Sequence, residues 1–114
     1  MKSLADRPIS EILIELKYME DINEIKKIYF ELEGNIGGFT YRSIRGTHYI
    51  VINQNLALER QIEVAYHEAK HVIDCESHGI YICELTNNNY DIYEINADNF
   101  ANDAMVLKLV SNFL

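Results

Sequence analysis

The sequence has little of several residue types, and each shortage excludes a class of protein. One proline and five glycines in 114 residues exclude a collagen-like or proline-rich chain. No run of about 18 apolar residues is present, which argues against a membrane-spanning helix. The first ten residues, MKSLADRPIS, do not have the pattern of a secretion signal. We therefore expect a cytoplasmic protein that does not interact with membranes.

Cationic residues and cysteines are also scarce. Ten Lys and Arg stand against 18 Asp and Glu, which gives a formal net charge of −8. Nucleic-acid binding depends on Lys and Arg that neutralise phosphates, so direct binding to nucleic acid is not expected, and a basic protein partner fits better. Cys75 and Cys83 could pair in a secreted protein, but a cytoplasmic location predicts two reduced thiols.

The rest of the composition is that of a globular protein. Hydrophobic residues make up 48% and charged residues 25% of the chain. A chain of this length can bury one core of helices packed on a small sheet. We therefore predict a single domain over residues 1–114.

The stretch EVAYHEAKHVIDCES contains the pattern H-E-x-x-H, formed by His67, Glu68 and His71. Asn55 can cap a helix that begins near Leu56. Apolar residues then recur at helical spacing: Leu58, Ile62, Ala65, Tyr66, Ala69, Val72 and Ile73. The two histidines are about 40° apart around this helix, on the side opposite the apolar stripe.

Two imidazoles one helical turn apart can both reach one Zn²⁺ ion, and Glu68 then lies beside them to take a proton from water. The alternative is a solvated helix face that carries two His and a Glu without a metal. A catalytic zinc usually has three protein ligands, so this interpretation requires a third.

A second helix is predicted from about Ile92 or Tyr93 onward, and it offers the third ligand. Alanines share one side of this helix with Glu94 and Asp98, which would allow a close approach to the first helix, whereas Phe100 is predicted on the opposite side. Glu94 is the candidate ligand. Asp98, one turn later, could accept a hydrogen bond from a ligating histidine and fix its tautomer. Alternatively, both are ordinary surface carboxylates.

With these residues, the sequence resembles the ImmA/IrrE family of small zinc metallopeptidases. The match runs through IGGFTYRSIRGTHYIVINQNLALERQIEVAYHEAKH and resumes at YEINADNFANDAMVL, over roughly residues 35–107. An I-x-I-N strand at 50–53, the H-E-x-x-H helix and a segment at 94–101 occupy the family's motif positions. The resemblance implies a cytosolic protease that cleaves or otherwise inactivates a helix-turn-helix repressor, often of a phage or mobile element.

The sequence departs from the usual H-E-L-G-H of that family. Ala69 and Lys70 stand in the middle of the motif, and a Pro that often follows the second helix is missing. Neither Ala69 nor Lys70 is a ligand, so metal binding is still expected. Lys70, next to the site, is expected to alter substrate preference.

The chain before the motif completes an α+β fold. Ile9, Ile12, Leu13 and Leu16 have the spacing of a packing helix, and a strand is favoured at about 27–32. The predicted architecture is a small zincin-like domain. It consists of an N-terminal helix, a three-stranded sheet, the H-E-x-x-H helix and a C-terminal helix that carries the third ligand.

Other residues are weaker candidates for the site. His48, His78 and Tyr90 could stabilise a tetrahedral intermediate, although both histidines are expected to be surface or loop residues. Tyr93 is expected to pack against apolar groups. A rival structural zinc cluster would use His71, Cys75, His78 and Cys83, but its spacing fits no familiar zinc ribbon.

The favoured mechanism has Zn²⁺ held by His67, His71 and Glu94, with Glu68 as the general base. An alternative is an anti-repressor that binds its target without cutting it and uses zinc structurally. A third interpretation, an interaction module without metal, leaves the joint pattern of Glu94 and the two histidines unexplained.

Overall fold

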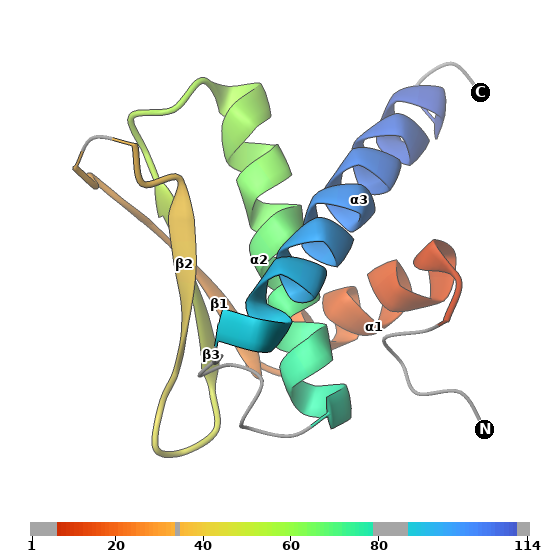
Figure 1. The fold of residues 1–114 in the computed structure, drawn as a ribbon, viewed down its shortest axis with the longest axis horizontal. Helices are drawn as coiled ribbons and strands as arrows, with labels where there is room; N and C mark the ends of the chain where they lie inside the picture. The colour runs from red at the N-terminus through yellow and green to blue at the C-terminus, as the bar shows by residue number, and fades with distance from the viewer. Residues whose placement is uncertain (1–6, 34, 79–86, 112–114) are drawn as a thin grey trace.

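The computed structural model describes residues 7–33, 35–78 and 87–111, and Figure 1 shows their arrangement. The elements in chain order are α1 (Ile9–Asp21), β1 (Ile25–Phe30), β2 (Gly38–Arg42), β3 (His48–Asn53), α2 (Leu58–His78) and α3 (Asn87–Ser111). This order confirms the predicted α+β class, with an N-terminal helix, a three-stranded sheet and two further helices. Within the described residues, no helix has the length and hydropathy needed to cross a membrane.

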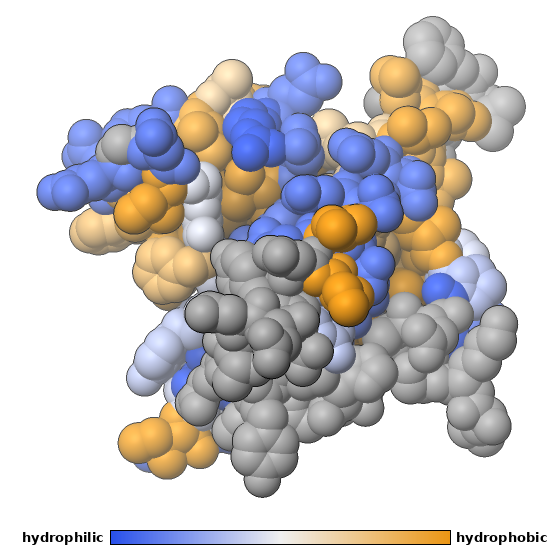
Figure 2. All heavy atoms as spheres, in the orientation of Figure 1, coloured by the Kyte–Doolittle hydropathy of each residue, from blue (hydrophilic) through white to orange (hydrophobic). Residues whose placement is uncertain are grey.

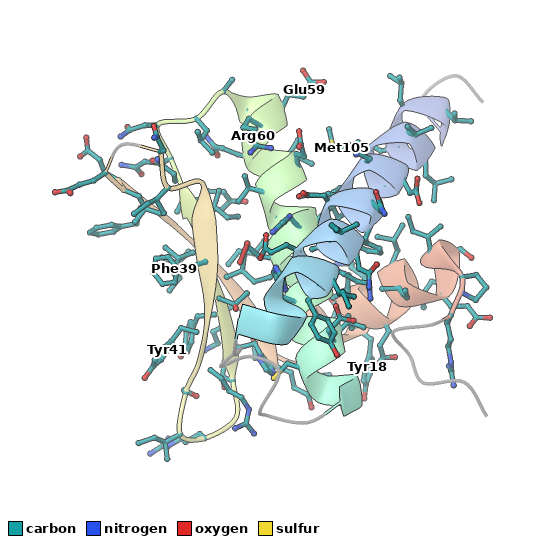
Figure 3. The ribbon with its side chains drawn as sticks, viewed as in Figure 1. Tyr18, Phe39, Tyr41, Glu59, Arg60 and Met105 are labelled. Atoms are coloured by element: carbon teal, nitrogen blue, oxygen red, sulfur yellow. The ribbon has the colours of Figure 1, made fainter. Side chains whose placement is uncertain are left out.

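The sheet places β3 in the centre, with β1 parallel to it and β2 antiparallel to it. The helices cover one face, and Phe39 and Tyr41 project from β2 on the side away from α2 (Figures 1 and 3). The strand predicted at 27–32 begins two residues earlier, at Ile25. The reason is the turn after α1, where Asn23 has a φ of 64° and the next residue, Glu24, already accepts a hydrogen bond from His48 N.

The core lies between the sheet and the helices. Alternate residues of β3 point inward, so that Ile50 and Ile52 are fully buried. Strand β1 adds Ile25, and the helices add the other core side chains: Ile12, Leu16 and Met19 from α1, Val64, Ala65, Ala69, Val72 and Ile73 from α2, and Phe100 from α3. Leu58 was predicted to share this stripe but is 72% exposed, because it lies in the first turn of α2, where only the end of α3 is nearby.

Asn53, at the end of β3, organises the loop that leads into α2. Its buried side chain accepts hydrogen bonds from the backbone N–H groups of Leu32 and Asn55 and donates to the carbonyl of Ile36. The predicted cap at Asn55 is therefore wrong, because its backbone is held by Asn53 and the helix begins at Leu58. The Asn of the I-x-I-N motif thus fixes where the H-E-x-x-H helix starts.

Helix α3 packs along α2 through small side chains. Ala97, Ala101 and Ala104 are all buried, as the sequence predicts for a close helix pair. Phe100 was predicted on the opposite side, but it is only 6% exposed and meets Tyr66 edge-on, with ring centroids 6.3 Å apart. The helix begins at Asn87, about five residues before the predicted start. This packing brings the first half of α3 against the histidine-bearing part of α2.

The start of β2 approaches α2 so closely that only glycine fits. A Cβ at Gly38 would lie 2.5 Å from the carbonyl oxygen of Val51 and 2.7 Å from Cγ1 of Val64. We predict that Gly38→Ala lowers the free energy of unfolding by about 1–3 kcal/mol, because the backbone or Val64 must shift. Gly37→Ala is the matched control, since its Cβ would be 3.2 Å from a side-chain methyl of Val64. Equal urea midpoints for the two variants would contradict this.

Candidate metal centre

Three side chains from α2 and α3 converge on one point. His67 Nε2 lies 3.1 Å from Glu94 Oε2, and His71 Nε2 lies 2.8 Å from Glu94 Oε1. The two Nε2 atoms are 3.2 Å apart, because His67 and His71 are one turn apart on α2. The structure thus brings together the three residues that the sequence singled out as ligands.

Asp98 orients one of these histidines. Its Oδ1 lies 2.7 Å from His67 Nδ1, the ring nitrogen that faces away from Glu94. A carboxylate at this distance accepts a hydrogen bond from Nδ1–H, which leaves the lone pair of the neutral ring on Nε2. Asp98 therefore sets the tautomer in which His67 Nε2 can bind a cation.

The arrangement fits a metal ion. His67 Nε2 and both Glu94 oxygens carry lone pairs that point into one space, and His71 can bring a proton into it. Facing lone pairs repel one another unless a proton or a cation lies between them. A tetrahedral zinc ion bonded at about 2.0–2.1 Å holds its ligand atoms about 3.4 Å apart, which is close to the observed spacing. A carboxylate oxygen of Glu68 also lies within 4.8 Å of a ring nitrogen of each histidine, so Glu68 is close to the position that the ion would take.

Glu68 lies at the edge of this cluster in a buried position. Its Oε2 is 3.6 Å from His67 Nε2, and the residue is 8% exposed. Burial raises the pKa of Glu68 from 4.5 to about 7, the electrostatic interaction with His67 opposes this, and the Glu94 carboxylate adds to it. Burial lowers the pKa of His71, which favours the neutral ring that a metal requires.

The raised pKa of Glu68 predicts that the free energy of unfolding of the metal-free protein depends on pH. Between pH 4.5 and about 7, the carboxyl of Glu68 ionises more readily in the unfolded chain than in the folded one. The free energy of unfolding should therefore fall as pH rises through this window. Glu68→Gln removes the unfavourable burial of an ionised carboxylate. At pH 8, the variant treated with EDTA should therefore be more stable than the parent by up to about 3 kcal/mol. At pH 4, the two proteins should differ little. Identical urea midpoints at pH 8 would contradict the burial of an ionised Glu68.

Asp98 gives a second prediction, about metal affinity. Asp98→Ala removes the acceptor that fixes the His67 tautomer but no ligand atom, so we expect the metal dissociation constant to rise about 10–100-fold. Competition with a chromogenic chelator measures it. Asp103→Ala is the control, because Asp103 lies on the same helix and lines a different hollow. An unchanged constant for Asp98→Ala would show that Asp98 does not orient the ligand.

A cleft of about 260 Å³ opens beside the cluster. It is lined by Gly37, Gly38, Arg60, Glu63, Val64, His67, Glu68, Glu94 and Asp98. The sequence reasoning did not single out Arg60 or Glu63, although they precede His67 by seven and four residues and so share its helix face. Arg60, labelled in Figure 3, pairs with Glu63 at 2.6 Å. Gly37 and Gly38, at the start of β2, also line this cleft.

Lys70 is not among the described residues that line this cleft, and its effect on substrate preference stays a prediction. Its Nζ pairs with Asp74 Oδ1 at 2.6 Å, and both side chains are buried. The pair lines a separate hollow that also includes Tyr93 and Phe100. The reason is helical geometry, because Lys70 and Asp74 are one turn apart on a different side of α2 from His67 and His71.

Of the weaker candidates His48, His78 and Tyr90, the structure describes the side chain of His48. His48 was expected at the surface, but it is 2% exposed, because it takes an inward position at the start of β3. It is also not among the residues that line the cleft. The side chains of His78 and Tyr90 lie outside the described residues, so their suggested roles stay predictions.

Cys75 differs in the structure from the predicted reduced thiol. It is buried and disulfide-bonded, so the prediction of a reduced thiol is wrong for this residue. Cys83 lies outside the described residues. A disulfide sulfur is not the thiolate that zinc requires, and this argues against the rival cluster that included Cys75.

The fold and the cluster together define a class, a small α+β domain whose His67, Glu68 and His71 could hold a metal ion. The model of the Peptidase_M78 family, described as an IrrE N-terminal-like domain, matches residues 23–108. The chain belongs to this family, and the match begins twelve residues before the resemblance found by reading motifs. No curated protein and no solved structure matches the chain.

Proposed function

We propose that the protein is a zinc-dependent endopeptidase that inactivates a helix-turn-helix repressor of a phage or mobile element. The observation that carries the proposal is the convergence of His67, His71 and Glu94 within 3.2 Å of one another, with Glu68 beside them in a cleft. When bound, zinc would polarise a water molecule and the scissile carbonyl group. Membership of a peptidase family supports the same chemistry.

The residues around the cluster have different roles in the proposed reaction. Glu68 has the position and the buried setting of a general base, since a carboxylate with a pKa of about 7 accepts a proton readily near neutral pH. It then returns the proton to the leaving amine. Asp98 keeps His67 in the tautomer that leaves Nε2 free, so it is a positioning residue.

The cleft suits an extended stretch of polypeptide. β2 is an edge strand, and its first residue, Gly38, lines the cleft together with His67 and Glu68. An extended segment of the target can add to such an edge through backbone hydrogen bonds. Three acidic side chains line the cleft besides Glu68, namely Glu63, Glu94 and Asp98, with Arg60 as the one cationic residue among the described lining residues. This balance favours a neutral or basic segment, as the net charge of −8 also suggests.

A second function, an anti-repressor that binds without cutting, is favoured by one detail of the site. Both oxygens of Glu94 contact the histidines, Oε2 next to His67 and Oε1 next to His71. A carboxylate that used both oxygens would fill, with the two imidazoles, four positions around a zinc ion. Such a closed set is typical of structural zinc.

Mass spectrometry of the target separates the two functions. The protein, loaded with zinc, is incubated with the purified repressor encoded nearest to it, and a parallel sample contains a chelator. The endopeptidase interpretation predicts two fragments that share one new pair of termini and are absent with chelator. Intact repressor in a stable complex, with no fragments, would support the anti-repressor.

A further inference from the structure

The outer face of α3 carries large apolar side chains that are exposed in the described part of the chain. Ile92, Ile95, Val106 and Leu109 are each 58–59% exposed. They lie on the side of α3 opposite Ala97, Ala101 and Ala104, which pack against α2. In Figure 2, apolar side chains occupy both ends of α3, with hydrophilic side chains between them. This helix is therefore apolar on two opposite sides, and its outer side is free to contact a partner.

These residues are not scattered, because they follow the spacing of a coiled coil. The outer face reads Ile92, Ile95, Asn99, Asn102, Val106 and Leu109, with steps of three, four, three, four and three residues. Such a 3-4 repeat is the a and d pattern with which one helix packs along another. Both asparagines are exposed, and a polar residue within such a seam fixes register and the number of helices. We call these six residues the α3 seam.

The α3 seam is complementary to the α3 seam of a second copy that runs in the opposite direction. Its members are placed symmetrically about the middle of the helix, between Phe100 and Ala101. In an antiparallel pair of identical helices, Ile92 therefore faces Leu109, Ile95 faces Val106, and Asn99 faces Asn102. Apolar side chains therefore contact each other at both ends of the seam. The asparagine side-chain amides, which can both donate and accept hydrogen bonds, contact each other in the middle. Two-fold symmetric interfaces require this kind of self-match.

We propose that two copies of this chain associate through their α3 seams, antiparallel, about a two-fold axis near Phe100 and Ala101. A hollow of about 350 Å³ supports this arrangement at the end of the seam. It is lined by Leu58, Ile62, Met105, Val106 and Leu109, among others. In the antiparallel register this hollow lies beside Ile92 of the second copy, so the exposed Leu58 also gains a partner.

The seam is short, which sets the expected strength of association. It spans 17 residue steps, about 26 Å of helix, or two and a half heptads. One helix per copy gives an interface near the lower end of the range for specific complexes. The dimer should therefore be reversible, with a dissociation constant in the micromolar range.

Sedimentation equilibrium on the full chain, with zinc bound, tests the proposal. At about 100 μM, where a micromolar complex is mostly formed, the parent should approach twice the monomer mass of 13.3 kDa. Ile95→Lys and Val106→Glu should each raise the dissociation constant at least tenfold. The chain that carries both changes should recover dimerisation, because each introduced ammonium then faces an introduced carboxylate of the other copy. In a parallel pair, like charges would meet instead.

Ile14→Lys is the matched control, because Ile14 is a 71% exposed isoleucine on α1 and outside the seam. It should dimerise as the parent does. Circular dichroism and zinc content show that each variant is folded. A parent that stays at 13.3 kDa up to 100 μM overturns the proposal. The proposal is also overturned if Ile14→Lys loses the dimer as the seam variants do. The same holds if both single seam variants still dimerise, or if the double variant stays monomeric.

Discussion

Replacing His67 or His71 with alanine is expected to abolish metal binding. The parent should contain about one zinc ion per chain after purification, because two imidazoles and the Glu94 carboxylate supply three ligands to one point. Each substitution removes one of the three and leaves a pair that holds the ion weakly. Zinc measured by inductively coupled plasma mass spectrometry should fall from about one to near zero. The parent's rise in melting temperature on adding zinc should disappear with it.

Glu63→Gln is the matched control for this experiment. Glu63 lies one turn before His67 and lines the same cleft, but it pairs with Arg60 and not with the histidines. Its replacement should leave the zinc content unchanged. Zinc retained in both histidine variants would place the metal elsewhere in the chain. Zinc lost in Glu63→Gln would show that zinc retention depends on the overall negative charge of the cleft and not on the three proposed ligands.

The Glu68→Gln variant should keep the metal but lose activity. Glutamine has nearly the same size and still forms hydrogen bonds, but it cannot accept the proton of the attacking water. Glu68 does not belong to the trio of His67, His71 and Glu94, so zinc content and binding of the target should be preserved. Cleavage of the repressor should slow about 100-fold or more, the usual effect of removing a general base.

The two functions predict different behaviour for this variant in a reporter strain. If the protein acts by cutting, repression should persist with Glu68→Gln at equal protein levels. If it acts by occupying its target, the variant should relieve repression as well as the parent does. Glu63→Gln again controls for the loss of a carboxylate from the cleft. Cleavage by Glu68→Gln at the parental rate would remove Glu68 from the mechanism.

The metal site could be predicted closely because it depends on local rules. One helical turn separates His67 from His71 whatever the rest of the fold does, and the same spacing relates Glu94 to Asp98 on α3. Alanines beside Glu94 predicted a close approach of the two helices, which the buried Ala97 and Ala101 confirm. The distances then follow from two regular helices packed side by side.

The errors arose where long-range packing decides the outcome. Lys70 was placed next to the site and His48 at the surface, yet both are buried, one in an ion pair with Asp74 and the other at an inward strand position. Periodicity does not reveal such partners, because burial of a charge depends on a neighbour that only the fold supplies. Asn55 failed as a cap for a similar reason. Asn53, whose partners are up to 21 residues away, holds that turn instead.

As a peptidase, each copy of the protein should cleave many target molecules in succession. The most direct test is to incubate the protein with a 20-fold excess of the cognate repressor and to follow intact repressor on a gel over time, beside Glu68→Gln under the same conditions. The account predicts that the parent removes many repressor molecules per chain, whereas Glu68→Gln removes almost none. Repressor that stays intact with both forms, while both relieve repression in the reporter strain, would contradict it.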